Sequence, residues 1–212
     1  MNYLELINKC LLELNYRQVN TFAELIKNDH KRILTILNII NKELCSVEGW
    51  NFLLRKTTLE LPAGTTEIDN TVNGRILYLF IDNKKYAFSE DVDLFICGKA
   101  KTGTYTSFSD KLLFPKFDKD KNIVIIYYTK NCAVSSDGVE KLNLESENDT
   151  SLVPMPFAEQ LLVYGTCLRL KANPQYFKFS YWLSMYKEAL LNLKSKTSVS
   201  VLNAPVVNIF RK

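Results

Sequence analysis

Helical periodicity returns late in the chain, in the stretch Pro156-Phe157-Ala158-Glu159-Gln160-Leu161-Leu162-Val163-Tyr164-Gly165-Thr166-Cys167-Leu168-Arg169-Leu170-Lys171. Proline is favoured at the first position of a helix, so Pro156 predicts where this one begins. Gly165 predicts close contact with another helix, and Asn173-Pro174 predicts the end. A last helix is indicated by a second apolar stripe, which comprises Phe179, Trp182, Leu183, Tyr186, Leu190 and Leu193.

Two helices are also predicted at the start of the chain. The first is indicated by apolar residues three and four apart, namely Leu4, Ile7, Leu11 and Leu14. The second starts near Asp29 and carries the same spacing at Ile33, Ile36, Leu37, Ile40, Leu44 and Val47. We expect it to run to about Glu48, where Gly49 provides a C-terminal stop.

Strands are predicted between these helical regions. Residues 52–61 are rich in strand formers, and residues 75–81 continue through Asp82-Asn83-Lys84-Lys85 into an apparent hairpin. The apolar run at 123–128 predicts a strand buried on both faces. Residues 91–121 fit either short strands or an inserted loop, and the polar residues 133–150 predict an exposed excursion.

The predicted class is therefore α+β, with an antiparallel helical bundle made from the N- and C-terminal helices, an inserted β-sheet or sandwich lobe, and an extended C-terminal tail. The expected divisions are residues 1–50 for the N-terminal helices, 51–150 for the β lobe, 151–196 for the helices that complete the bundle, and 197–212 for the tail. A chain of 212 residues suits one domain, or one domain with a lobe.

The tail is too apolar to be a simple solvated end, and Pro205 prevents a continuous helix through it. Fully extended, it reaches roughly 50 Å, against a radius of gyration of about 17 Å for a compact chain of this length. It therefore predicts an arm that docks on another subunit, or an edge strand folded back on its own β lobe. The predicted docking residues are Val199, Val201, Leu202, Val206, Val207, Ile209 and Phe210.

Charge and cysteine content give little support for a nucleic-acid-binding, disulfide-rich or zinc-binding protein. Residues 151–212 carry 8 basic and 2 acidic side chains, but their spacing is typical of the solvated faces of helices. The five scattered cysteines predict reduced thiols and form no C-x-x-C pair. Neither a signal peptide nor a membrane-spanning stretch is indicated.

Four places in the sequence partly match catalytic or metal-binding motifs. His30, the only histidine, falls at the polar start of the second helix, where an exposed residue is expected. Residues 118–122 begin like a calcium loop, but Ile123 stands where that loop requires glycine. Residues 98–104 lack the Gly-Lys order of a phosphate loop. Glu48 beside Trp50 is expected to be a helix-end residue, so no catalytic, metal or cofactor-binding residue is predicted, and the chain is predicted not to be an enzyme.

Several segments resemble the head-to-tail adaptors of short-tailed bacteriophages, the tail tubular protein A-like ring proteins that sit beneath the portal. The similar segments are the opening helix Tyr3–Leu14, the phrase Glu48-Gly49-Trp50 followed by Phe52-Leu53-Leu54 and residues 57–64, and the returning helix 156–171. Residues 91–150 are outside the resemblance.

The resemblance implies a structural virion protein of the neck or tail, assembled in the host cytoplasm. It implies a homo-oligomeric ring, dodecameric like the portal, that extends the channel for double-stranded DNA. The implied partners are the portal protein and a downstream tail or nozzle protein, with no membrane and no cofactor. The segment Val199 to Lys212 corresponds to the extended C-terminal arm with which such adaptors reach the portal or an adjacent subunit.

Two other functions compete with this one. A virion-associated cell-wall glycosidase is suggested only by the 23 carboxylates, any two of which can meet in a fold. A nucleic-acid-binding module is suggested by the basic, aromatic C-terminal third, and it requires exposed stacking aromatics, whereas Trp182 and Tyr186 are expected to be buried.

Overall fold

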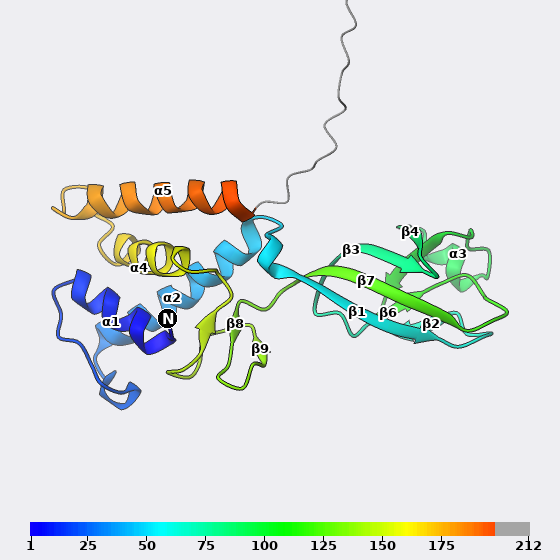
Figure 1. The fold of residues 1–212 in the computed structure, drawn as a ribbon, viewed down its shortest axis with the longest axis horizontal. Helices are drawn as coiled ribbons and strands as arrows, with labels where there is room; N and C mark the ends of the chain where they lie inside the picture. Colours follow the sequence, from blue (N-terminus) through cyan, green and yellow to red (C-terminus); the bar gives the residue numbers. More distant parts are fainter. Residues whose placement is uncertain (198–212) are drawn as a thin grey trace, which may run out of the picture.

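The computed structural model describes residues 1–197, which form a helical body joined to a β lobe (Figure 1). The α+β class predicted from the sequence is confirmed. The helices are α1 (Tyr3–Glu13), α2 (Asn28–Val47), α3 (Val92–Ile96), α4 (Phe157–Leu170) and α5 (Phe179–Thr197), with short 3-10 turns η1 (Phe22–Glu24) and η2 (Asn51–Leu53). No helix in this part of the chain is long and apolar enough to cross a bilayer.

The first helix begins with a reciprocal cap. The Asn2 side chain accepts a hydrogen bond from Glu5 N, and Glu5 Oε2 accepts one from Asn2 N, both at 2.9 Å. This capping box satisfies N–H groups that the first helical turn leaves without partners. The apolar stripe of α1 then buries Leu6, Ile7 and Leu11 completely.

Helix α4 lies at the centre of the helical body and contacts α1, α2 and α5. It begins at Phe157, one residue later than predicted, and Pro156 occupies the N-cap. A Cβ atom at Gly165 would lie 3.0 Å from Tyr186 Cε2 and 3.2 Å from Ile40 Cδ1. Glycine therefore lets α2 and α5 pack closely on α4, which confirms the predicted helix contact.

The β lobe is one sheet with the strand order β1-β7-β3-β4-β5-β6-β2. Its neighbours are antiparallel except for the parallel pair β4 and β5. The predicted hairpin is present between β3 and β4, where Asp82 and Asn83 both have positive φ, as a two-residue hairpin turn requires. The strands are β1 (Leu54–Leu61), β2 (Glu67–Asp69), β3 (Gly74–Ile81), β4 (Lys84–Phe88), β5 (Thr104–Phe108), β6 (Lys111–Leu113) and β7 (Lys121–Thr129).

The prediction that 123–128 is buried on both faces is wrong. Ile123 and Ile125 are fully buried, but Val124 and Ile126 on the opposite face are only half-buried. Successive side chains of a strand point to opposite faces, and this sheet encloses a core on one face only. That core comprises Leu61, Val72, Leu79, Ile81, Tyr86, Tyr105, Leu112, Phe114, Ile123 and Ile125.

The polar stretch 133–150 is not an exposed excursion, because it packs on the helical body. It forms a small sheet of β8 (Ala133–Val134), β9 (Glu140–Lys141) and β10 (Thr150–Ser151). Ala133 and Leu144 belong to the helical core. Asn38 of α2 donates to Leu144 O at 2.9 Å and accepts from Leu144 N at 2.8 Å. Side-chain hydrogen bonds thus hold this stretch against the helical body. Its sequence lacks the apolar pattern that would have predicted burial.

The expectation that His30 is exposed is also wrong. His30 is 6% exposed, and its Nδ1 has no hydrogen-bond partner. The link before α2 lines the same small hollow as His30, and Asn8 of α1 fixes that link by bonding both Val19 N and Val19 O at 2.9 and 2.8 Å. A polar linker therefore covers the start of the helix.

Candidate partner-docking site

The predicted tail comprises residues 197–212, and Thr197 belongs to α5. We call the remaining residues, 198–212, the C-terminal strip. Its seven predicted docking residues lie outside the described residues, which end at Thr197: Val199, Val201, Leu202, Val206, Val207, Ile209 and Phe210. The described residues nevertheless locate the point at which the strip begins. On α5, Lys194 Nζ lies 2.5 Å from Oε1 of Glu48, the residue that follows α2. The C-terminal end of α5, the last described part of the chain, therefore lies beside the join between the helical body and the β lobe (Figure 1).

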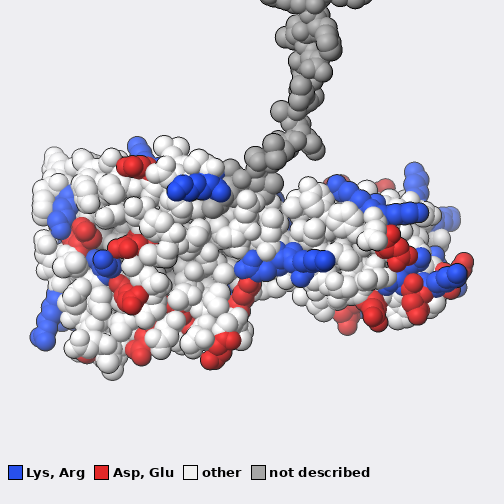
Figure 2. All heavy atoms as spheres, in the orientation of Figure 1, with Lys and Arg blue, Asp and Glu red and all other residues white. Residues whose placement is uncertain are grey.

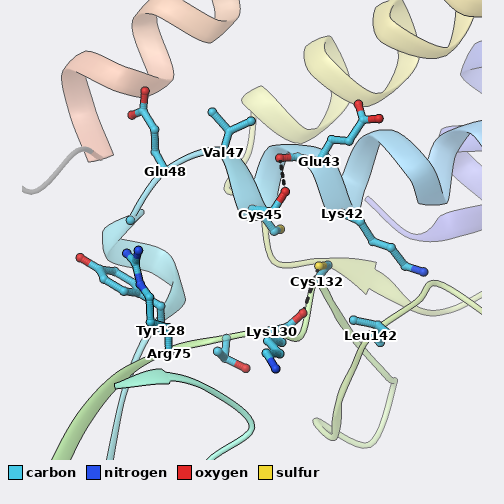
Figure 3. Close-up of a pocket in the computed structure, with 13 residues that line it drawn as sticks. Lys42, Glu43, Cys45, Val47, Glu48, Arg75, Tyr128, Lys130, Cys132 and Leu142 are labelled. Atoms are coloured by element: carbon cyan, nitrogen blue, oxygen red, sulfur yellow. Dashed lines mark hydrogen bonds between the residues drawn. The ribbon is translucent and has the colours of Figure 1, made fainter. Parts of the chain in front are cut away.

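A pocket of about 610 Å³ opens at this join, and we call it the junction pocket (Figure 3). Four separate parts of the chain form it: the C-terminal end of α2 with the two residues that follow, the start of β3, the end of β7 with the residues after it, and the loop after β9. The lining residues are Lys42, Glu43, Cys45, Ser46, Val47, Glu48, Gly49, Arg75, Tyr128, Thr129, Lys130, Cys132 and Leu142.

Apolar side chains remain uncovered at the junction pocket. Val47 is 60% exposed and Leu142 is 49% exposed, although both are large hydrophobic residues. Val47 lines the pocket from the end of α2, and Leu142 lines it from the loop after β9, on separate sides of the space (Figure 3). Exposed apolar groups gathered around a concave site are typical of a surface that binds another apolar segment.

Gly49 shapes one wall of the pocket. A Cβ atom there would lie 2.7 Å from Tyr128 Cζ and from Tyr128 Oη, closer than packed atoms approach. Glycine thus admits the Tyr128 ring beside the end of α2, and the Arg75 guanidinium lies 5.3 Å from the centre of the same ring. Helix α2 ends at Val47, one residue before the predicted Glu48, and Gly49 also makes room for the pocket wall.

The carboxylates of the junction pocket are engaged in ion pairs. Glu43 of α2 pairs with Arg169 of α4, and Glu48 pairs with Lys194 of α5. Trp50, next to Glu48 in sequence, is buried and donates through Nε1 to Leu44 O at 2.6 Å. These contacts tie the ends of three helices together and hold the pocket rim.

Two thiols meet in the pocket wall. Interaction with the Cys132 thiol raises the pKa of Cys45, with burial adding to the effect. The same interaction lowers the pKa of Cys132, and nearby Lys42 lowers it further. All five cysteines are free, as predicted. Among residues 1–197, no group of three or more potential metal ligands gathers here or elsewhere.

No protein-family model matches this sequence, and no curated protein matches it. The residues and their geometry therefore carry the functional assignment.

The motifs considered for catalysis lie apart from the junction pocket. Asp120 Oδ1 accepts a hydrogen bond from Ala63 N at 2.7 Å and so ties the turn after β1 to the entry of β7. The glycines of residues 98–104 have φ values of +67° and +88°, which is turn geometry next to the one-turn helix α3. Both segments belong to the β lobe.

The basic C-terminal helices use lysines in packing contacts. Lys178 Nζ lies 3.7 Å from Glu13 Oε2 and donates to Glu13 O at 2.7 Å. Trp182 is fully buried, as predicted, and donates to Glu13 Oε2 at 2.9 Å, whereas Tyr186 is half-buried. The face displayed in Figure 2 intersperses basic and acidic side chains over both parts of the molecule. This face has no single-sign surface of the kind that nucleic acid selects.

The junction pocket is not predictable from local sequence because its walls are distant in sequence. Val47 was assigned to a buried stripe, and Leu142 is an isolated apolar residue in a polar stretch. The isolated Leu142 is the one local signal of the pocket, because a leucine in a polar stretch is expected to contact an apolar residue from another part of the chain.

Proposed function

We propose that this chain is a structural virion protein, a head-to-tail adaptor that forms a ring below the portal and connects the DNA channel to the tail. In this proposal α1, α2, α4 and α5 are the antiparallel bundle, and the C-terminal strip is the extended arm. The ring is dodecameric, and its neighbours are the portal protein and a downstream tail protein.

One observation carries the proposal. The segments that resemble the adaptors fall in α1, in the passage from α2 to β1, and in α4, which come from distant parts of the chain yet meet in and beside one helical body. The β lobe projects from that body, and the strip begins at the join (Figure 1). A projecting lobe and an apolar arm both offer surface for contacts between subunits.

The test mixes the purified full chain with the portal protein of the same virus and images the mixture by electron microscopy. The expected result is a ring at the base of the portal. Replacing Ile209 and Phe210 together by Asp should abolish it, because two charges would have to enter an apolar contact. The matched control places the same two charges at Asn203 and Asn208, polar positions of the same strip, and should still form the ring.

A chain that stays monomeric both alone and with the portal would refute the proposal. An equal loss of ring formation in the apolar variant and its control would refute the role of the apolar residues.

A further inference from the structure

We propose that the junction pocket binds the chain's own C-terminal strip while no partner is bound. The inference goes beyond the adaptor function and does not depend on it, since it concerns the isolated chain. It assigns an occupant to a pocket that the described residues leave open, and it gives the apolar residues of the strip a place to bury.

Proximity favours this occupant. The Lys194–Glu48 pair, at 2.5 Å, joins the last turn of α5 to Glu48 at the edge of the pocket. Thr197 follows Lys194 by less than one helical turn, so the strip starts at that edge. A segment tethered this closely has an effective concentration on the order of millimolar. A second copy of the chain reaches that concentration only in very concentrated solution.

Chemical complementarity favours the same occupant. The strip has apolar residues at Val206, Val207, Ile209 and Phe210. The pocket lining includes the exposed apolar side chains of Val47 and Leu142 and the Tyr128 ring, and its volume of about 610 Å³ lies within the range of pockets that enclose a small organic ligand. Such a space accepts a few side chains of the strip and not the whole segment.

The alternative site in the same chain is the outer edge of β1. This strand stands at one end of the sheet order and pairs with β7 alone among the described strands. Its exposed residues include Lys56 and Glu60, and charged side chains on an edge strand oppose the addition of another strand.

Hydrogen exchange on the purified full chain tests the proposal. At low micromolar concentration, the amides of residues 206–210 should exchange at least about tenfold more slowly than they do in the Val47→Glu/Leu142→Glu variant. Both substituted side chains are exposed, so the helical body should keep its fold, and protection of the α4 amides checks this. The control Leu191→Glu changes a side chain that is 68% exposed on α5 and should leave the strip protected.

Several results would overturn the inference. They are strip amides that exchange freely in the wild-type chain, protection that survives the two pocket substitutions, and protection that increases with protein concentration, which would assign the pocket to a second copy. Protection of the β1 amides by the strip would instead assign it to the sheet edge. None of these measurements involves the portal, so they stand apart from the test of the adaptor function.

Discussion

Replacing Asp149 should destabilise the loop that carries the rim of the junction pocket. Asp149 is 1% exposed, and its Oδ2 accepts hydrogen bonds from Glu145 N at 2.7 Å and Ser146 N at 2.9 Å. Both carboxylate oxygens lie 3.4 Å from Lys141 Nζ, and Lys141 precedes the rim residue Leu142. One buried carboxylate therefore closes the turn between β9 and β10.

The magnitude follows from these bonds. A hydrogen bond to a charged group contributes about 1.5–3 kcal/mol, and Asp149→Ala removes two of them together with the Lys141 contact. The loop is partly open to water, which replaces part of the loss, so we expect about 3 kcal/mol. For a chain of this size that corresponds to a fall in Tm of about 6–12 °C. The matched control is Asp137→Ala in the exposed turn at Gly138, which should change Tm by about 2 °C at most.

The same carboxylate should make stability depend on pH. Burial would raise the pKa of Asp149, but the Ser146 and Glu145 amides and the Lys141 ammonium outweigh it and hold the pKa below its ordinary value. Because the folded-state pKa is depressed, the stabilisation is fully present above the unfolded value of about 3.9 and is lost as pH falls through the folded value. Asp149→Asn should be less stable at neutral pH and should flatten this acid-side loss. Equal Tm values for wild type and Asp149→Ala, or equal slopes for wild type and Asp149→Asn in this acid range, would refute the reasoning.

Three other substitutions test the helical body and the pocket rim. Gly165→Val should cost about 1–3 kcal/mol in denaturant unfolding, because its Cβ alone would meet Tyr186 at 3.0 Å and Ile40 at 3.2 Å; an unchanged midpoint would contradict the packing. Trp182→Phe should cost about 1–3 kcal/mol by the same measurement, since it removes the 2.9 Å bond to Glu13 and part of a fully buried ring; a neutral effect would count against that bond. Lys194→Ala should cost under about 1 kcal/mol, and less in high salt, because the pair with Glu48 is partly exposed; a large, salt-independent loss would indicate another role.

The helices were predictable because each carries its own apolar stripe. The spacing of Ile33, Leu37, Ile40 and Leu44 locates α2, and the turn at Asp82-Asn83 locates the hairpin, from local sequence alone. These signals need no knowledge of the neighbouring elements.

The errors arose where burial depends on a distant polar partner. His30 is covered by a linker that Asn8 fixes, and the 133–150 stretch is held by Asn38 of α2 and by Asp149. Hydrophobic periodicity predicts that polar side chains are exposed. Here Asn8, Asn38 and Asp149 instead form hydrogen bonds that hold loops against the helical body. The junction pocket was not predictable for a different reason, because its lining residues come from distant parts of the chain.

Together, the two proposals predict that substitutions in the junction pocket and substitutions in the strip change the affinity for the portal in opposite directions. If the junction pocket holds the strip in nine of ten molecules, the apparent affinity of the strip for its partner falls about tenfold, or about 1.4 kcal/mol. Val47→Glu and Leu142→Glu should then strengthen binding to the portal, because they release the strip.

Substitutions in the strip itself, such as Ile209→Asp with Phe210→Asp, should weaken portal binding, because the same side chains serve both sites. A titration of labelled full chain against portal measures both effects, with Leu191→Glu as the neutral control. Pocket variants that bind less tightly than the wild type would place the pocket within the contact to the portal or to the next subunit. Pocket variants that bind equally would show that the strip is already free, because a pocket that never holds it imposes no competition.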